Sequence, residues 1–235
     1  MPNNYFKFRQ FLIRQDKCAF KVGTDGVILG AAADIAGASR ILDIGSGTGL
    51  IAIMLAQRSN ALITALEPDT DSFLQLSDNV SACRWKERIS AVNSRIQDFK
   101  ANQKFDLIVS NPPYFINSVR NPDSRKSGTR HNDTLSHDDL LSGVSQLMGK
   151  EGKLQVIMPF VEGNILIAEA AAYGLYINKV LKIKPLPTSD IRRMVMTFSR
   201  NRSNPTEKFL TIEHGRRHEF TEEYKNFTRE FYLNF

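Results

Sequence analysis

The chain has 235 residues, of which 42% are hydrophobic and 24% are charged, and its formal net charge is +6. That length accommodates one large α/β domain and is short for two complete ones. No stretch has the apolar length of a signal-peptide core or a membrane span, so we expect a cytoplasmic protein without membrane attachment. The modest positive charge suits a polyanionic partner without requiring one.

Cysteine and histidine usage argues against disulfides and metals. Cys18 and Cys83 are the two cysteines, and they lie far apart in the sequence, outside any paired motif. His214 and His218 have a spacing that helices use for metal ligands, but the glycine and two arginines between them indicate an exposed basic turn. We therefore predict neither a disulfide framework nor a bound metal.

Helix-like and strand-like segments alternate along the chain, which is typical of a parallel sheet covered by helices. Asp69 and Ser136 are favourable N-cap residues for two of the helices, and Gly174 is a favourable stop for a third. We predict strands at 40–44, 61–66, 89–92, 105–109, 153–158, 175–184 and 194–200, and helices at 27–33, 48–58, 70–83, 136–148 and 162–173.

These elements make up a single domain in three parts. Residues 1–36 form an N-terminal extension with a helix, residues 37–205 form the catalytic core, and residues 206–235 form a C-terminal addition. The last part carries aromatic residues at helical spacing, which indicates core packing rather than a ligand-binding surface. They are Phe220, Tyr224, Phe227, Phe231 and Tyr232.

A glycine-rich turn joins the strand 40–44 to the following helix. Gly45, Gly47 and Gly49 allow a tight turn and the close approach of a ligand to the backbone. Their spacing differs from the Gly-x-Gly-x-x-Gly of dinucleotide enzymes, and Asp43 precedes them on the strand. A carboxylate at that place suits the ammonium and sulfonium groups of S-adenosyl-L-methionine better than a pyrophosphate.

Two further acidic positions follow neighbouring strands. Glu67 ends the second strand, where a carboxylate can accept hydrogen bonds from both ribose hydroxyls. Asp98 and Phe99 follow the third strand, in a place suited to an adenine amino group and its ring. Each feature alone also fits an ordinary α/β turn with surface acids. Together they favour a site for an adenosine-containing cofactor.

In this order, the glycine motif and the two acids resemble the class I methyltransferase pattern over about residues 18–200. The resemblance implies a Rossmann-like α/β fold with a seven-stranded, mostly parallel sheet, helices on both faces and an antiparallel last strand. It also implies S-adenosyl-L-methionine as the methyl donor. Thr24 and Asp25 match the family's motif near the donor's methionine end, and they equally fit a helix cap.

Asn111-Pro112-Pro113-Tyr114 follows the strand 105–109 at its carboxyl end, where ligands bind in open α/β sheets. A planar amino group is a poor nucleophile because its lone pair is delocalised, so it must be aimed. The Asn111 side-chain oxygen, which also borders the donor, and the Pro112 carbonyl can each accept one N–H. Tyr114 can stack on a base. The motif therefore predicts methylation of a planar amine without a metal.

The tetrapeptide leaves the amine open, because adenine N6, guanine N2 and glutamine amide enzymes share it. The start of the chain, Phe6 to Phe11, the residue Phe115 and the segment Ser136 to Leu141 resemble a subfamily of bacterial tRNA adenine-N6-methyltransferases. That resemblance implies the adenosine at position 37, beside the anticodon of tRNA1(Val), as substrate. An unpaired base in a loop reduces the cost of extracting it.

Basic residues near the expected pocket agree with an RNA substrate, although each cluster also fits a solvated surface. A long polar segment spans 117–134 and is predicted as a substrate loop. The candidate RNA-binding residues are Arg120, Arg125, Lys126, Arg130, Arg192 and Arg193.

Three alternatives remain open. A release-factor glutamine N5-methyltransferase has a separate helical N-terminal domain, whereas about 35 residues precede the first strand here. A guanine-N2 RNA methyltransferase uses the same chemistry. A non-catalytic RNA-binding module requires losses in the glycine motif or at Asn111, and both are intact.

We expect the protein to be a monomer.

Overall fold

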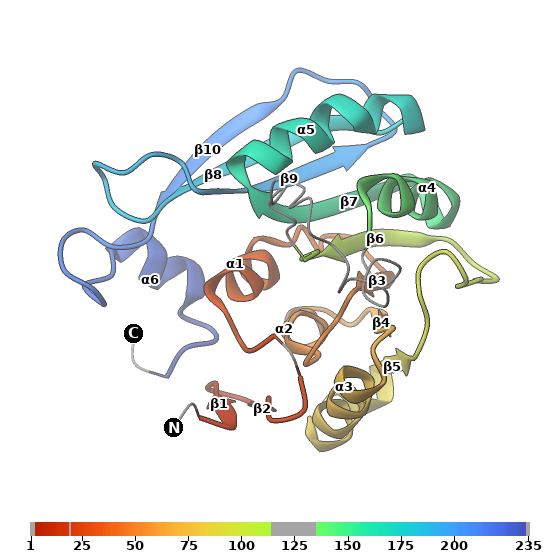
Figure 1. Ribbon diagram of the computed structural model, residues 1–235, viewed down its shortest axis with the longest axis horizontal. Coiled ribbons are helices and arrows are strands. Elements are labelled where there is room, and N and C mark those ends of the chain that lie inside the picture. Colours follow the sequence, from red (N-terminus) through yellow and green to blue (C-terminus); the bar gives the residue numbers. More distant parts are fainter. Residues whose placement is uncertain (1–2, 19, 114–134, 234–235) are drawn as a thin grey trace, which may run out of the picture.

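The computed structural model describes residues 3–18, 20–113 and 135–233. Its centre is an eight-stranded sheet with the order β10-β8-β9-β7-β6-β3-β4-β5 (Figure 1). Neighbouring strands run parallel except β9, which lies antiparallel to both β7 and β8. The strands are β3 (Arg40–Ile44), β4 (Leu62–Leu66), β5 (Ile89–Val92), β6 (Phe105–Ser110), β7 (Met148–Pro159), β8 (Tyr176–Lys184), β9 (Arg193–Ser199) and β10 (Thr206–Thr211).

The predicted fold class is confirmed, and the predicted strand number was wrong. The eighth strand, β10, comes from the C-terminal addition and pairs parallel with β8 at the edge of the sheet. Only Leu210 of this strand is buried, so the segment lacks the alternation of apolar and polar residues that marks a half-buried strand. An edge strand of this kind leaves almost no signal in the sequence.

Helices cover both faces of the sheet (Figure 1). One hydrophobic core includes residues of α1 (Thr24–Ala32), α2 (Leu50–Arg58), α3 (Thr70–Ala82) and α6 (Glu222–Thr228). The other core includes residues of α4 (His137–Leu147) and α5 (Phe160–Ala170). Short 3-10 turns, Lys86–Arg88 and Ala171–Tyr173, follow α3 and α5.

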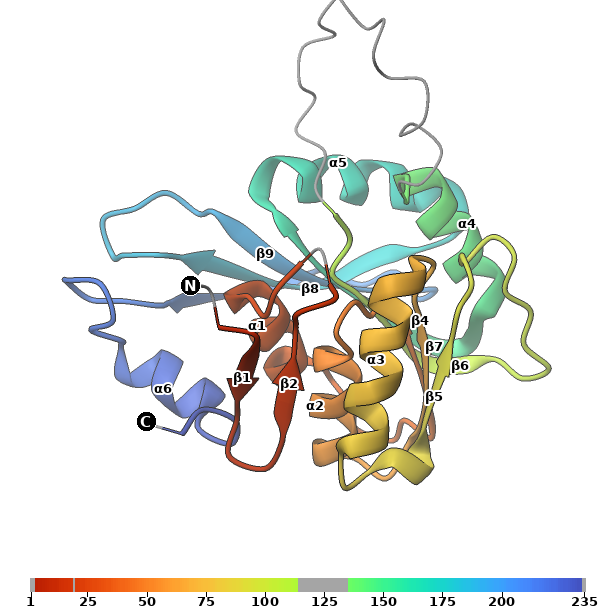
Figure 2. The same cartoon turned by 60° about the horizontal axis from the view of Figure 1, so that its bottom comes forward.

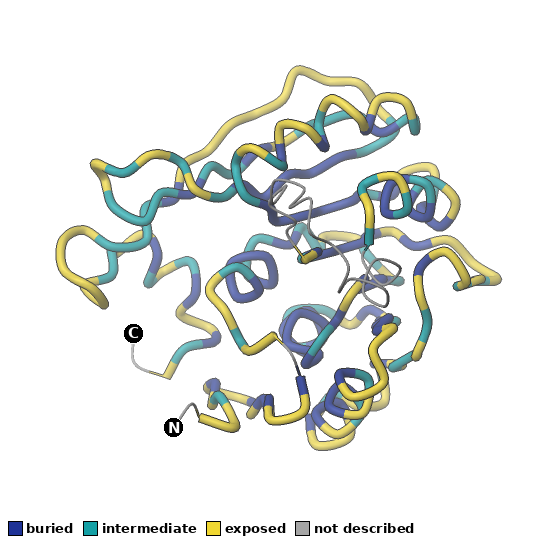
Figure 3. Tube along the Cα trace, in the orientation of Figure 1, coloured by how far each residue is buried: buried dark blue, intermediate teal, exposed yellow. Residues whose placement is uncertain are grey.

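Helix starts and burial follow the sequence closely. The side chain of Asp69 accepts a hydrogen bond from the Ser72 backbone N–H at 2.8 Å, which caps α3. Ser136 caps α4 in the same way through Asp139 N–H. In contrast, α2 is buried continuously from Leu50 to Ala56 (Figure 3). Gly49 is its N-cap residue, so the glycine-rich turn leads directly into a buried helix.

The first residues form a β-hairpin that the sequence did not indicate. Strands β1 (Tyr5–Lys7) and β2 (Leu12–Arg14) pair antiparallel and lie between α6 and α3 (Figure 2). Phe8, Phe11 and Ile13 are buried in the same core as the tail residues Tyr224 and Phe231. The two ends of the chain are therefore joined through packing.

Candidate active site

The two motifs identified in the sequence leave the sheet side by side. Strands β3 and β6 are parallel neighbours, and Ile44 is the register partner of Ser110. The Ser110 hydroxyl donates a hydrogen bond to the Ile44 carbonyl at 2.9 Å, which fastens the two strand ends together. The next residues are Gly45 and Asn111. Both motifs therefore begin at adjacent positions on the carboxyl edge of the sheet.

All three glycines of the glycine-rich turn have a left-handed backbone conformation, which favours glycine over other residues. Gly45, Gly47 and Gly49 have φ angles of 71°, 53° and 82°. The Gly45 and Ser46 N–H groups both donate to the Leu66 carbonyl, at 3.0 and 2.9 Å. A Cβ atom added at Gly45 or Gly47 would meet nothing within 4 Å. The turn is rigidly held from behind and open on the side where a ligand would lie.

Asp43 is a buried carboxylate at the end of β3, with 0% of its surface exposed. Neither carboxylate oxygen has a hydrogen-bond partner among the residues that the structure describes. Burial raises the pKa of Asp43 to about 7. A buried acceptor of this kind fits a cationic ligand, which would supply the missing partner. The ammonium group predicted to lie here therefore suits the residue.

Glu67, at the end of β4, bridges two backbone segments. Its Oε2 accepts from Gly47 N–H at 2.8 Å, and its Oε1 accepts from Asp69 N–H at 3.0 Å. Burial raises its pKa despite these two hydrogen bonds. Asn93 holds the Glu67 backbone carbonyl at 2.8 Å. A carboxylate has about four acceptor sites, so the two oxygens retain capacity for hydroxyl donors.

The predicted adenine contacts occupy different surroundings. Asp98 is exposed, whereas Phe99 is half-buried. The Phe99 ring lies 6.4 Å from the ring of Phe105, which starts β6 at the opposite edge of the sheet from Asn111. The aromatic ring therefore has a packing role of its own. Contact of either side chain with an adenine stays a prediction.

The amine-presenting motif is described in part. Asn111 is half-buried, Pro112 is buried and Pro113 is exposed. Tyr114 lies outside the described residues. The structure thus positions the first acceptor, Asn111, directly after the last residue of β6, where the strand pairing with β3 fixes the backbone.

Two residues assigned to different ligands contact each other. Helix α1 begins at Thr24, which is exposed, and the Asp25 carboxylate accepts from the Arg193 guanidinium at 2.8 Å. Arg193 pairs in register with Pro159 at the carboxyl end of β7, so the ion pair lies at the edge of the sheet that carries the glycine turn. Asp25 and Arg193 neutralise each other in this state.

The remaining candidates for RNA contact are less defined. Arg192 is exposed, and its backbone N–H donates to the Ile183 carbonyl at 2.9 Å. The other four basic residues lie outside the described residues. They are Arg120, Arg125, Lys126 and Arg130.

Within 3–18, 20–113 and 135–233, no helix is long and apolar enough to cross a membrane. The same ranges contain no group of three or more His, Cys, Asp or Glu side chains that could hold a metal ion.

Sequence reasoning missed two polar residues that hold the site together. Ser110 is 0% exposed and ties β6 to β3, as described above. Asn79 is 2% exposed, and its side-chain N–H group donates to the Thr48 carbonyl inside the glycine turn at 2.8 Å. The available signal was a polar residue in an apolar context: Ser110 ends an apolar strand, and Asn79 lies one turn after Gln75 on the buried face of α3.

Comparison with known proteins identifies the family. Residues 27–158 match the methyltransferase small domain. The chain belongs to this family. The matched residues of this methyltransferase extend from α1 to the carboxyl end of β7, and they include the glycine turn, Asp43, Glu67 and Asn111.

Curated relatives match the methyltransferase over its whole length. The chain is 45% identical to a tRNA1(Val) (adenine(37)-N6)-methyltransferase of Bacteroides thetaiotaomicron, covering 100% of this chain and 99% of the relative. It is 42% identical to a protein of the same name in Trichodesmium erythraeum, covering 100% of both.

Solved structures share the fold. A predicted O-methyltransferase of Agrobacterium tumefaciens matches with a TM-score of 0.60 at 22% identity, covering 88% of this chain and 96% of that one. TYW2 of Pyrococcus horikoshii matches with a TM-score of 0.59 at 15% identity, covering 84% of this chain and 71% of that one. These similarities confirm the class I methyltransferase fold.

Proposed function

We propose that this methyltransferase transfers a methyl group from S-adenosyl-L-methionine to the exocyclic N6 of an adenine in tRNA, at adenosine 37 of tRNA1(Val). The observation that carries the proposal is the adjacency of the two motifs. The glycine turn and Asn111 leave neighbouring strands whose ends are fastened by Ser110. The full-length relatives, which bear the name of that activity, support the choice of substrate.

The donor site would be made by residues at the ends of two strands, β3 and β4. Asp43 would receive the ammonium group, because its buried carboxylate has no partner among the described residues. Glu67 would receive the ribose hydroxyls with the acceptor capacity left by its two backbone contacts. The glycine turn would leave room for the ligand, because the space beside Gly45 and Gly47 is empty to 4 Å around a Cβ position. S-adenosyl-L-methionine supplies an electrophilic methyl group.

The chemical work of the protein is then to position the amine. The Asn111 side-chain oxygen and the Pro112 carbonyl each accept one N–H of the amino group. These bonds draw the nitrogen toward tetrahedral geometry and free its lone pair to attack. The amine nitrogen would gain a bond to the methyl carbon as the sulfur–methyl bond of the donor breaks and S-adenosylhomocysteine leaves, and the nitrogen would then release one proton to water. Proximity and orientation supply most of the rate acceleration in such a site, and no general base with a tuned pKa is required.

The substrate side of the proposal depends on charge and on an accessible base. We assign Arg192 and the basic residues of 120–130 to phosphate contacts, and Tyr114 to stacking on the adenine. Arg193 would contact RNA only after exchanging its partner Asp25, which is 2.8 Å away. A tRNA anticodon loop offers an adenine that need not be unpaired first.

We also propose that residues 1–36, 37–205 and 206–235 form one catalytic unit that acts as a monomer in the cytoplasm. Support comes from the shared core, which contains Phe8, Ile53 and Phe231 from the three parts. Cys18 and Cys83 are both free thiols, which suits a reducing compartment.

Product analysis tests the proposal. The protein is incubated with methyl-labelled S-adenosyl-L-methionine and, in separate reactions, with total tRNA or a release factor, and each product is digested and identified. We expect label in N6-methyladenosine from tRNA1(Val). Label on a glutamine side chain, or on guanine N2, would replace the proposed substrate.

A further inference from the structure

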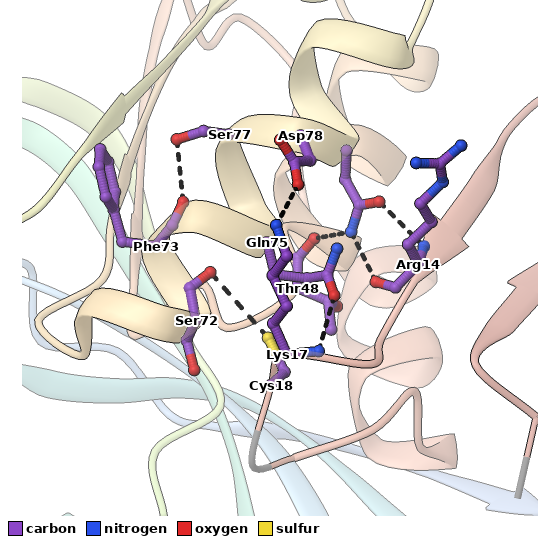
Figure 4. Close-up of polar contacts among 10 residues, drawn as sticks. Arg14, Lys17, Cys18, Thr48, Ser72, Phe73, Gln75, Ser77 and Asp78 are labelled. Atoms are coloured by element: carbon purple, nitrogen blue, oxygen red, sulfur yellow. Dashed lines mark hydrogen bonds and ion pairs between the residues drawn. The ribbon is translucent and has the colours of Figure 1, made fainter.

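A buried amide connects the N-terminal segment to the glycine turn. Asn79 lies on α3, and its side-chain Nδ2 group donates to the Thr48 carbonyl and to the Arg14 carbonyl, both at 2.8 Å. Its Oδ1 accepts from the Arg14 N–H at 2.9 Å. Both N–H donors and the oxygen of the Asn79 amide are thus engaged by two separate backbone segments. Figure 4 shows Arg14, Lys17 and Thr48 beside α3, which carries Gln75.

The Thr48 carbonyl lies between two glycines of the turn that have positive φ angles. Thr48 stands between Gly47, whose N–H contacts Glu67, and Gly49, which precedes α2. Both glycines have left-handed backbone angles, so a rotation of the peptide group at Thr48 would change the cradle directly. The Asn79 amide fixes the orientation of that peptide group.

Gln75 provides a natural comparison. It lies one turn earlier on α3, is 1% exposed, and its Oε1 accepts from the Lys17 backbone N–H at 3.0 Å. Gln75 therefore also fastens the N-terminal segment to α3. Asn79 also contacts the glycine turn, at the Thr48 carbonyl, whereas the Gln75 hydrogen bond goes to the N-terminal segment.

We propose that Asn79 is a positioning residue for donor binding, which holds the Thr48 carbonyl and couples the segment around Arg14 to the donor site. The inference rests on the proposed function, since it takes the glycine turn as the donor cradle. Coupling between two sites is reciprocal. If the Asn79 hydrogen bonds to Arg14 favour donor binding by a given free energy, donor binding stabilises those hydrogen bonds by the same amount.

Asn79→Ala and Gln75→Ala form a matched pair. Each removes a side-chain acceptor for a backbone N–H of the N-terminal segment, and Asn79→Ala also removes the donor to the Arg14 and Thr48 carbonyls. We therefore expect both variants to have a lower melting temperature, with the larger loss in Asn79→Ala. We expect Asn79→Ala to weaken binding of S-adenosylhomocysteine in calorimetric titration by about fivefold or more, within the usual range of coupling between sites. Gln75→Ala should bind it within about twofold of the wild type, and kcat should change less than the donor KM in Asn79→Ala.

The results separate the possible failures. Equal affinity in the wild type and Asn79→Ala, or an equal loss in Gln75→Ala, would overturn the positioning role while the proposed function stands. Absence of binding by the wild type would overturn the proposed function and this inference with it.

Hydrogen exchange of the wild type keeps the inference testable if Asn79→Ala does not fold. S-adenosylhomocysteine should slow exchange of the Arg14 amide, which Asn79 holds. It should leave the Phe8 amide, which donates to Phe11 within the hairpin, nearly unchanged. Protection of the glycine turn without protection of Arg14 would contradict the coupling.

Discussion

The donor site contains two carboxylates, Asp43 and Glu67, whose surroundings give them different roles. Glu67 is held by two backbone N–H groups, so its position is fixed before a ligand arrives. Asp43 is more deeply buried and has no hydrogen-bond partner for either oxygen among the described residues. It is therefore the residue whose electrostatic state should change most when a cation binds.

This difference predicts pH-dependent donor binding. Burial raises the pKa of Asp43 to about 7, so below that pH the carboxyl must lose its proton before it can pair with an ammonium. Affinity for S-adenosylhomocysteine should fall as the pH is lowered through about 7, approaching tenfold for each further unit. Calorimetric titration across this range measures the slope. Asp43→Asn should bind weakly and lose that slope, and an unchanged slope would assign the titration to another group.

Part of this site could be predicted from the types of residue at the ends of the strands. Asp43, Glu67 and Asn111 could be identified because strand ends in a parallel sheet converge and because their chemistry matches the ligand. Ser110 and Asn79 could not, because their value lies in contacts with residues 66 and 31 positions away, which no local pattern encodes.

At the scale of elements, the glycine turn combines open space with one close contact. A Cβ at Gly47 would meet nothing within 4 Å, whereas a Cβ at Gly49 would stand 2.7 Å from the Leu76 side chain. Both positions have positive φ, so both substitutions carry the backbone cost of a left-handed residue. Their effects should diverge because only one of them also disturbs the packing of α3.

Gly47→Ala should lower stability by about 1 to 2 kcal/mol, the usual cost of a left-handed non-glycine residue. It should also weaken donor binding directly, because the added methyl group would occupy space proposed for the donor. Gly49→Ala should lower stability further, because Leu76 must move. Urea denaturation and donor titration of both variants measure the two effects. Normal donor affinity in Gly47→Ala at unchanged fold would remove this glycine from the site.

Elements with a strong apolar pattern were predictable, and exposed ones were not. Strands β3 and β5 lie where predicted, and the caps at Asp69 and Ser136 are confirmed. Strand β10 and the N-terminal hairpin were missed because short edge strands expose most of their residues.

At the scale of the whole molecule, the additions at both ends belong to the core of the sheet domain. Phe231 is 1% exposed, and its carbonyl accepts from the Arg9 N–H at 2.8 Å. The predicted packing role of the tail aromatics is confirmed by the burial of Tyr224 and Phe231. The packing of the N-terminal segment against the C-terminal segment could not be predicted, because it depends on contacts between residues at opposite ends of the sequence.

Phe231→Ala should therefore destabilise the entire protein by about 3 to 5 kcal/mol, as expected for removal of a fully buried aromatic ring. Trp85, the single tryptophan, stands next to Phe11 and reports on the N-terminal hairpin by fluorescence. Circular dichroism reports on the helices. Both transitions in urea should shift together. Separate transitions would show that the ends unfold independently of the core.

The central claim is that Asn111, set beside the glycine turn by the pairing of β6 with β3, presents the amine for transfer. Single-turnover methylation of tRNA by Asn111→Ala, measured together with donor affinity, tests it most directly. We predict a rate reduced by about a hundredfold or more, with S-adenosylhomocysteine affinity within about threefold of the wild type. A single-turnover rate equal to that of the wild type would contradict the account.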